Sequence, residues 1–547
     1  MDSCASGLQE SIDSFGEPGP QRLRGRGKGV VPTMIHVISG GWAWAIFIVT
    51  AIIMVYMSYW IYKRTRVDTA EQFMVASRGV PWALITASIA ATELWAGSLL
   101  ASAEGVYNWG ISGMWMYCLP TGIAFSVFAF VARRARYLIP RGITVGSWMR
   151  ERYDATTHII FTLVALYIMF VFTMFQCIGG ATVFSLVFDI DYTTAAVCIA
   201  LVFTLYFLFA GMWSTLVTAF VQYFVVVAIL VILVPYITFK LGGPGDIWTN
   251  FQANIEDAKM TSMFRGDAIW GYFMLTLGGW GVIATMSNYA WQRAYAVEKK
   301  HVFRSMFWGG WLWVPLALVS STVGIIGISL GLKVEVGTDI FPTVVSTVTG
   351  TWGAVWLALA LLFAIYSSGA AYLGGFSSLI MHDLYQKYVE KRPENETVSA
   401  KAARDKKELL YIRLISIAYG VGIAIVVVLL QKVSLLDTML STGVFISAAF
   451  FPIVAGLWWK RTSSLAATLG IVASVGICLY LMLWTDVELT WVYIASYAIS
   501  VGVTVLVSLI KPDDYDYEAL RERMSLAAEQ ADAEKARLAA AAAAGEV

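Results

Sequence analysis

Charged residues are scarce in this chain of 547 residues. Asp, Glu, Lys and Arg together make up 14% of it, whereas hydrophobic residues make up 58%. A soluble domain carries about 25% charged residues, because its surface must be covered by groups that water solvates. The composition therefore excludes a soluble globular protein and indicates a polytopic membrane protein.

Cysteine and histidine are also scarce. The chain has five cysteines and four histidines, scattered without paired spacing, which excludes a disulfide framework and a Cys/His metal site. The sequence contains no Walker-type phosphate loop, and its hydrophobic segments hold no nucleophile–base arrangement. It therefore predicts a protein that is not an enzyme, with neither nucleic acid nor an obligate protein as a partner.

Long hydrophobic runs are the most abundant feature. A segment needs about 20 apolar residues to cross a bilayer as a helix, and about thirteen segments meet this length. We therefore predict an all-α polytopic membrane protein with about thirteen transmembrane helices. The predicted spans are residues 42–62, 82–106, 111–132, 157–186, 193–210, 214–239, 268–291, 305–330, 352–381, 411–430, 435–458, 464–484 and 490–510.

Basic residues follow every second predicted span, whereas loops between them, such as 187–192 and 485–489, carry acids. Because cytoplasmic loops are enriched in Lys and Arg, this alternation places the C-terminus in the cytoplasm and the N-terminus outside a plasma membrane. The basic stretches are residues 63–66, 133–152, 293–304, 382–410 and 460–461.

Two polar tails flank the predicted membrane domain, residues 41–510. Residues 1–40 lack the apolar core of a signal peptide, so we expect a disordered tail or a true start at Met34. Residues 511–547 have the pattern of a polar, then alanine-rich helix. We interpret them as a solvated cytoplasmic tail.

The second span, residues 82–106, carries an acid, Glu93, near its middle. An ionisable group at the bilayer centre costs several kcal/mol unless something satisfies it. The small and hydroxylated residues around it would let the helix open and expose backbone carbonyls to a cavity. The alternative is a tightly packed interior helix, in which small residues only permit close contact.

The seventh span, residues 268–291, contains a second group of residues that would let a membrane helix open. They are the glycines Gly278, Gly279 and Gly281. Many secondary transporters consist of two inverted five-helix repeats, with one interrupted helix of each repeat at the binding site. Spans two to six (about 82–240) and seven to eleven (about 268–459) would form these repeats. An odd number of crossings makes the two repeats antiparallel, as inversion requires.

The ninth span contains two adjacent serines, Ser367 and Ser368. Their hydroxyls are neutral oxygen ligands, suited to a monovalent cation that must be held weakly enough to leave. The alternative is that they only bond to the backbone of their own helix. With carbonyls exposed near Ala91 and Leu94, they would form a sodium cage.

Four motifs in this order resemble the sodium/solute symporter family, which contains transporters of proline, sugars, pantothenate and sialic acid. The resemblance covers roughly residues 40–510. The motifs are Ala103–Gly110, the glycine-rich signature Gly211–Gln222, Gln292-Arg293 and His382–Tyr385.

The resemblance implies a co-transported sodium ion between spans two and nine. It also places Glu93 where proline-type members carry an aspartate, so that an acid beside the site would attract the cation. The implied sodium ligands are the backbone carbonyls of Ala91, Leu94 and Ala364 and the hydroxyls of Ser367 and Ser368.

The chain departs from the family signature at Ala219, where the family has an acidic residue. In some relatives this acid contributes to a second sodium site. Its loss therefore predicts one sodium ion per turnover.

The resemblance also implies a solute site beside the sodium ion, lined by spans two, four, seven and eleven. No Lys or Arg lies mid-span to pair with a solute carboxylate, although the N-terminus of a broken helix can bind one. The candidate solute-binding residues are Trp95, Ser98, Gln176, Ser287 and Asn288.

We expect a sodium-coupled symporter that moves a small organic solute by alternating access. The first alternative is a proton-coupled symporter on the same fold, with Glu93 as the titrating group. The oxygen-rich pair Ser367 and Ser368 favours sodium, because a proton needs only one acceptor. The second alternative is a membrane sensor on the transporter scaffold, which is disfavoured because the tail after residue 510 is too short for a signalling kinase domain.

Overall fold

The computed structural model describes residues 38–76, 78–390, 398–430 and 435–543. All but the last three residues of the predicted N-terminal tail, with the possible start at Met34, lie outside the described residues. Within the described part the chain is helical and contains no β-strand. The all-α prediction is therefore confirmed.

The helices follow one another along the chain with short connections. Those of the first half are α2 (Gly40–Thr65), α3 (Ala70–Val75), α4 (Trp82–Glu93), α5 (Ala96–Trp109), η1 (Gly110–Ser112), α6 (Gly113–Leu138), α7 (Val145–Arg152), α8 (Ala155–Val187), α9 (Tyr192–Ala210), α10 (Met212–Lys240) and α11 (Pro244–Asn254). Those of the second half are η2 (Ala258–Thr261), α12 (Gly266–Ala268), η3 (Ile269–Phe273), α13 (Met274–Trp280), α14 (Ile283–Met286), α15 (Asn288–Ala296), η4 (Lys299–His301), α16 (Val302–Trp311), α17 (Val314–Ser329), η5 (Gly337–Asp339), α18 (Ile340–Ser378), η6 (Leu379–Val389), α19 (Val398–Leu429), α20 (Leu435–Trp458), α21 (Ser464–Trp484), α22 (Leu489–Ile510) and α23 (Tyr517–Ala543).

Twelve helical runs in the described part are long and apolar enough to cross a membrane. The count is one lower than predicted because the second span consists of two short helices, α4 with 12 residues and α5 with 14 residues. Neither reaches the length of a span alone, and α5 runs on through η1 into α6 as one stretch, Ala96–Leu138. The protein is a multi-pass membrane protein.

The second span is broken beside its acid. Glu93 ends α4, and Leu94 (φ −79°, ψ 45°) and Trp95 (φ −72°, ψ 159°) leave the helical conformation before α5 begins. The Ser98 hydroxyl donates to the carbonyls of Glu93 (2.9 Å) and Trp95 (2.7 Å). The bond to Glu93 satisfies a carbonyl that the break removes from the helical ladder, whereas the Trp95 carbonyl also accepts from the backbone N–H groups of Ser98 and Leu99. The predicted opening of this helix is confirmed.

The seventh span is interrupted twice. The first interruption follows α13 at Gly281, where a Cβ atom would lie 2.5 Å from the carbonyl oxygen of Leu277. The second is at Ser287 (φ −84°, ψ 106°), between α14 and α15. The indole nitrogen of Trp291 donates to the carbonyl of Thr285 (2.8 Å) and so ties the two short helices together. The glycines of the seventh span predicted the first interruption, whereas the sequence did not predict the second interruption, at Ser287.

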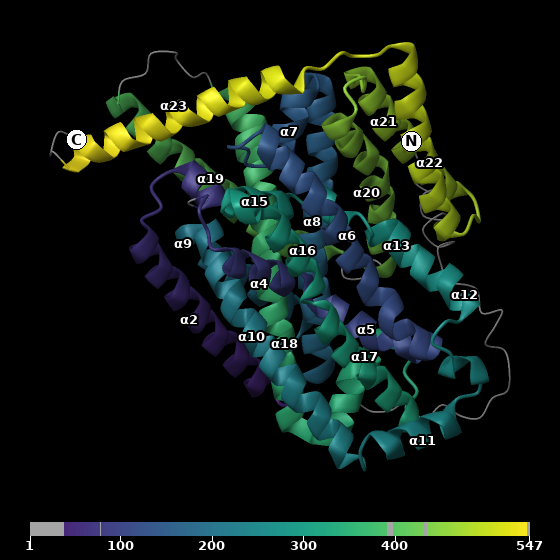
Figure 1. Ribbon diagram of the computed structural model, residues 1–547. Coiled ribbons are helices and arrows are strands. Elements are labelled where there is room, and N and C mark those ends of the chain that lie inside the picture. Colours follow the sequence, from purple (N-terminus) through teal and green to yellow (C-terminus); the bar gives the residue numbers. More distant parts are fainter. Residues whose placement is uncertain (1–37, 77, 391–397, 431–434, 544–547) are drawn as a thin grey trace, which may run out of the picture. The chain divides into compact units, whose positions relative to one another are not determined.

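Helix α18 lies between the two broken helices. It packs against α4 and α5 on one side and against α15, α8, α9 and α10 on others, and Figure 1 shows it in the middle of the bundle. Gly350 (φ 66°, ψ −150°) bends α18, so the ninth span is the part after this glycine. The serine pair of this span therefore lies where it can reach the broken helices.

Three of the basic loops meet at one end of the bundle, which we call the basic end. Arg78, after the first span, donates to the carbonyls of Gly142 (2.8 Å) and Arg141 (3.0 Å), after the third span. Arg136 donates to the carbonyl of Val297 (3.5 Å), after the seventh span. The loops after the first, third and seventh spans, which the alternation of basic residues predicts on one side of the membrane, are therefore in contact with one another.

The segment after α22 is anchored at the basic end by Arg152, the last residue of α7. This arginine is buried, and its Nη1 pairs with Asp513 Oδ2 at 3.0 Å. Its other N–H groups donate to three carbonyls at the end of α20 and in the loop that follows, those of Gly456 (3.3 Å), Lys460 (3.2 Å) and Thr462. Arg152 thus ties α7 to α20 and to the C-terminal segment.

Replacing Arg152 by alanine is expected to lower the free energy of unfolding by about 2–3 kcal/mol, because several buried acceptors lose a charged donor. Thermal unfolding in detergent measures the loss. Arg150 is the matched control, since it lies on the same helix and its guanidinium rests on the ring of Tyr388, 5.6 Å from the centroid. Equal losses in the Arg150→Ala and Arg152→Ala variants would contradict the anchoring role.

Candidate functional site

Two serines of α18 face the broken end of α4. Ser367 Oγ lies 2.7 Å from the carbonyl oxygen of Ala91 and 2.8 Å from that of Ala364. Ser368 Oγ lies 2.7 Å from the carbonyl oxygen of Thr92 and 3.0 Å from that of Ala364. All five residues are buried. We call these two hydroxyls and three carbonyls the oxygen cluster.

The oxygen cluster contains four of the five residues that the family resemblance implies as sodium ligands. They are Ala91, Ala364, Ser367 and Ser368. The fifth, Leu94, lies in the break after α4, with its N–H bonded to the carbonyl of Ala90 (3.0 Å). The third carbonyl of the cluster is that of Thr92, a residue that the resemblance does not imply as a ligand.

Glu93, Tyr289 and Arg293 form a buried charge network beside the oxygen cluster. The Tyr289 hydroxyl donates to Glu93 Oε1. Arg293 donates from Nε to the Ser88 hydroxyl (2.9 Å) and from Nη2 to the Thr92 hydroxyl (3.2 Å). Its Nη1 donates to the carbonyl of Tyr289 (3.3 Å), and its guanidinium lies 5.0 Å from the centroid of that ring. Thr92 belongs to both the network and the oxygen cluster.

The burial of Arg293 is a finding that the sequence did not predict. The pattern placed this residue at the end of the seventh span, where a basic side chain ordinarily reaches water. In the structure all nine residues of α15 are buried, and Arg293 is 1% exposed. Glu93 therefore has an internal counter-charge, which offsets part of the cost of placing an acid at this depth.

A cavity of about 30 Å³ borders Glu93. Its walls come from both broken helices and from α6, α8 and α18. The lining residues are Glu93, Trp95, Tyr117, Thr121, Phe172, Trp280, Ile283 and Tyr372. We call it the central cavity.

Of the five candidate solute-binding residues, Trp95 lines the central cavity. Ser98 is buried beneath the break, where it caps the carbonyls of Glu93 and Trp95. Gln176 donates to the carbonyl of Phe172 (3.3 Å) within its own helix. Ser98 and Gln176 are therefore not among the residues that line the central cavity.

The other two candidates, Ser287 and Asn288, lie at the second interruption of the seventh span. Asn288 accepts from the backbone N–H of Val145 (3.1 Å) and donates to the carbonyl of Gly375 (2.8 Å). Its amide therefore joins α15 to the N-terminus of α7 and to α18. Asn288 thus links three segments on the side of the bundle where the basic end lies.

The N-terminus of α7 is also held by a buried carboxylate, Asp383 of η6. The Thr144 hydroxyl donates to Asp383 Oδ1 (3.0 Å), and His158 Nε2 lies 3.4 Å from the same oxygen. Both Asp383 and His158 are 0% exposed. Gly146 lies directly against the carboxylate, where no side chain fits. Asp383, which belongs to the motif His382–Tyr385, thus holds the N-terminus of α7 in place.

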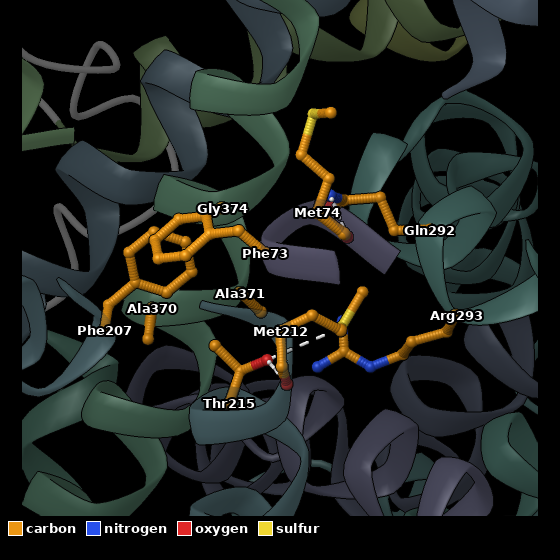
Figure 2. Close-up of a pocket in the computed structure, with 10 residues that line it drawn as sticks. All are labelled: Phe73, Met74, Phe207, Met212, Thr215, Gln292, Arg293, Ala370, Ala371 and Gly374. Carbon is orange, nitrogen blue, oxygen red and sulfur yellow. Dashed lines mark hydrogen bonds between the residues drawn. The ribbon is translucent and has the colours of Figure 1, made fainter. Parts of the chain in front are cut away.

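A second, smaller cavity lies between the charge network and the basic end. It has a volume of about 10 Å³ and borders α3, α9, α10, α15 and α18. Figure 2 shows Arg293 pointing toward Met212 and Thr215 at the start of α10. The Thr215 hydroxyl donates to the carbonyl of Met212 (2.8 Å). The guanidinium of Arg293 therefore borders this cavity together with the start of α10.

Comparison with known proteins identifies relatives over most of the chain. A urea–proton symporter of Oryza sativa subsp. japonica is 25% identical over 517 residues, which cover 85% of this chain and 70% of the relative. A high-affinity proline transporter of Bacillus subtilis (strain 168) is 25% identical over 461 residues, which cover 80% of this chain and 91% of the transporter.

A solved structure and a family model agree with these relatives. A Na⁺-coupled sialic acid symporter in a substrate-bound outward-open state shares the fold, with a TM-score of 0.73 at 16% identity over 87% of this chain and 99% of that one. The model described as "Sodium:solute symporter family" matches residues 73–474. Since this match covers most of the chain, the protein belongs to the sodium:solute symporter family.

Proposed function

We propose that the protein is a sodium-coupled symporter that carries a small organic solute across the plasma membrane by alternating access. Membership of the family supports secondary active symport. The observation that carries the choice of sodium is the oxygen cluster between the broken end of α4 and the serines of α18. The cluster contains five neutral oxygen atoms and no charged ligand.

The oxygen cluster suits a cation that must bind and leave. A hydroxyl group has two lone pairs besides its single O–H. When Ser367 and Ser368 donate to the carbonyl of Ala364 in their own helix, their lone pairs and the carbonyls of Ala91 and Thr92 become free to bind the ion. Carbonyl and hydroxyl oxygens replace the water shell of a small cation without holding it by charge.

The same break connects the ion to the solute. Sodium between α4 and α18 would hold the end of α4 in place, and the next residues, Glu93 and Trp95, line the central cavity. Each ligand would then favour the conformation that binds the other, and this coupling is reciprocal. Opening toward the basic end requires that the contacts of Asn288 with Val145 and Gly375 separate.

We further propose that one sodium ion moves per turnover. The signature position on α10 is Ala219, which offers no carboxylate. The nearby cavity is bordered by the guanidinium of Arg293, and a fixed positive charge in a low-dielectric interior repels a second cation. A measured coupling of two sodium ions to one solute would contradict this stoichiometry.

The arrangement of the chain in the membrane follows from the loops. We propose that residues 41–510 form the transporter domain, with inverted repeats at about 82–240 and 268–459. The two interrupted helices begin these repeats, which supports the assignment. The basic end would face the cytoplasm with the C-terminal tail, residues 511–547, and the N-terminus would lie outside.

Replacing Ser368 by alanine is expected to raise the sodium concentration needed for half-maximal stabilisation at least tenfold, because the ion loses a ligand. The measurement is the apparent unfolding temperature during a sodium titration at constant ionic strength, with potassium as the counter-salt. An ion that binds only the folded state raises stability by mass action, so no solute is required. The control is Ser346→Ala, whose hydroxyl on the same helix bonds to the carbonyl of Thr343 (3.1 Å). An unchanged sodium response in Ser368→Ala would contradict the proposed site.

Proton coupling is the second candidate. Two observations favour it: a relative is a urea–proton symporter, and the buried carboxylate of Glu93 lines the central cavity. Uptake into proteoliposomes separates the two functions. A solute gradient driven by sodium at constant pH supports sodium coupling, whereas a gradient driven by a pH difference in potassium alone supports proton coupling.

A further inference from the structure

The last helix of the described chain, α23, is docked onto the bundle by its first turns. The hydroxyl of Tyr517, its first residue, donates to the carbonyl of Gly456 on α20 (2.6 Å). Leu520 is 3% exposed, and Tyr517 and Met524 pack against the main hydrophobic core. Because the removal of apolar side chains from water is favourable, these turns are held against the bundle.

Two arginines of α23 contact two different helices of the basic end. The guanidinium of Arg521 lies 4.5 Å from the centroid of the Tyr137 ring, in the last turn of α6. Arg523 Nη2 pairs with Glu151 Oε2 of α7 at 2.6 Å. The hydroxyl of Tyr515, just before α23, donates to the carbonyl of Glu151 (2.6 Å). The C-terminal helix therefore joins α6 to α7.

These two helices lie on different sides of the proposed opening. Helix α6 packs against α5, α14, α15 and α16, and so against parts of both broken spans, whereas α7 packs against α8 and η6. Opening toward the basic end separates α15 from α7 and α18, because it breaks the contacts of Asn288 with Val145 and Gly375. Since α6 packs with α15, α23 spans the line along which the bundle opens.

A third cavity, of about 610 Å³, lies at the basic end, and α23 forms part of its wall. Ala528 and Ala531 of α23 line it together with residues of α3, α6, η6, α19 and the basic loops. Pockets for small-molecule ligands have volumes of about 300–1,000 Å³, so a small solute fits into this space. We call it the basic-end cavity.

The basic-end cavity is linked to the solute site through a series of lining residues. Met74 of α3 lines both this cavity and the smaller cavity that Arg293 borders. Arg293 in turn contacts Tyr289, the partner of Glu93, and Glu93 lines the central cavity. Met74 is 1% exposed, and it lies between the last two cavities on the way to the basic end.

We propose that α23 is a strap that opposes opening at the basic end. While it holds both Tyr137 of α6 and Glu151 of α7, these helices stay together and the solute cannot leave through the basic-end cavity. The side chains of Arg521 and Arg523 are 45% and 62% exposed, and exposed contacts of these kinds are weak, so the strap can release without unfolding of the bundle. This regulatory contact rests on the proposed transport by alternating access and lies outside the ion and solute sites.

Two introduced cysteines measure the effect of the strap without any solute. Gln72→Cys lies in the wall of the basic-end cavity, where the native side chain is partly exposed, and reports whether α23 covers this cavity. Met74→Cys lies at the buried position between the two cavities and reports whether the bundle opens. The measurement is the rate of labelling by a charged thiol reagent in detergent with potassium as the only salt cation, and the unaltered chain gives the rate of the native cysteines.

Removal of α23 is the first test. A chain that ends at Asp516 lacks this helix but keeps Asp513, the partner of Arg152. We expect the labelling of Met74→Cys to become about tenfold faster in this chain, because the buried contacts of α23 are lost together with its two arginine contacts. A chain that ends at Ala531 keeps the docked turns, and it serves as the control with an unchanged rate.

A full-length variant is the second test, since truncation can disturb folding. Arg521→Ala together with Arg523→Ala removes the contacts with α6 and α7 and leaves the rest of α23 in place. We expect Met74→Cys to be labelled about two- to fivefold faster, as suits the loss of two exposed contacts. Glu522→Ala is the control, because this side chain is exposed between the two arginines on the same turn.

The outcomes separate the strap from a mere cover and from the transport proposal. If only Gln72→Cys is labelled faster, α23 covers the basic-end cavity without holding the bundle closed, and the proposal is wrong. An unchanged rate of Met74→Cys in the folded double-arginine variant also contradicts it. Because these rates require neither sodium nor a solute, the strap can fail while sodium-coupled transport stands, and the sodium titration of Ser368→Ala tests the latter separately.

Discussion

Replacing Arg293 by glutamine is expected to lower the free energy of unfolding by about 2–3 kcal/mol, because the buried hydroxyls of Ser88 and Thr92 and the carbonyl of Tyr289 lose a charged donor. Glu93 also loses the positive charge that lies beyond Tyr289. Sodium-dependent uptake should be lost as well. The guanidinium holds the hydroxyls of Ser88 and Thr92, and the carbonyl of Thr92 belongs to the oxygen cluster. Thermal unfolding measures the first effect, and uptake into proteoliposomes measures the second.

A double substitution shows whether charge compensation is the cause. If Arg293 stabilises the fold mainly by compensating Glu93, removing both charges costs less than the sum of the two single losses. We therefore expect Glu93→Gln with Arg293→Gln to regain at least 1 kcal/mol over additivity, a coupling of about the size found between contacting residues. Strict additivity would contradict the charge network.

The control for Arg293 is Arg304 of α16. Its side chain is exposed and its guanidinium stacks on the ring of Trp82, 3.8 Å from the centroid. Arg304→Gln removes a positive charge from the same end of the bundle but leaves no buried carboxylate behind. We expect a loss below about 1 kcal/mol, since such contacts at exposed sites contribute this little.

The hydrophobic pattern was sufficient to predict the helices and the first break. Apart from the interruptions of the second and seventh spans and the junction of α16 and α17 in the eighth, the predicted spans coincide with helix in the described residues, because a bilayer requires every backbone polar group to be satisfied within its own segment. The acid at Glu93, among small residues, indicated where the second span opens, and the structure ends α4 at this residue. The serine pair on α18 was found because hydroxyls are conspicuous in an apolar span.

The rest of the site depends on contacts between segments far apart in the chain. Arg293 had the sequence position of an ordinary basic residue at a span end, and only the burial of α15 brings it to Thr92, 201 residues away. Asn288 had the pattern of a solute ligand, but in the structure its amide joins α7 and α18. Sequence spacing within one span carries no information about such partners.

Another close contact between distant segments predicts the second large effect. Gly146 lies in the first turn of α7 against the carboxylate of Asp383. A Cβ atom on residue 146 would lie 2.7 Å from Oδ2 and still closer to Cγ and Oδ1. The aspartate cannot yield, because it is fully buried and its Oδ1 is held by Thr144 and His158.

Replacing Gly146 by alanine is therefore expected to push α7 away from η6 and to destabilise the protein by about 1–3 kcal/mol, the usual cost of overpacking. The displaced helix should also weaken the bond between Val145 and Asn288 that links α7 to α15. The matched control is Gly179→Ala on α8, where nothing lies within 4 Å of an added Cβ. That change is expected to be neutral or to stabilise by up to about 1 kcal/mol through helix propensity.

The cause of the effect can be isolated by shortening the obstructing side chain. In an Asp383→Ser background the carboxylate is gone, so Gly146→Ala should cost clearly less than it does in the unaltered protein, a non-additivity expected of residues in contact. Asp383→Ser alone loses the bonds to Thr144 and His158 and lowers stability by itself, and the comparison is therefore made within each background. If Gly146→Ala is as harmless as Gly179→Ala in both, α7 is not seated on Asp383, and its link to α15 does not depend on this contact.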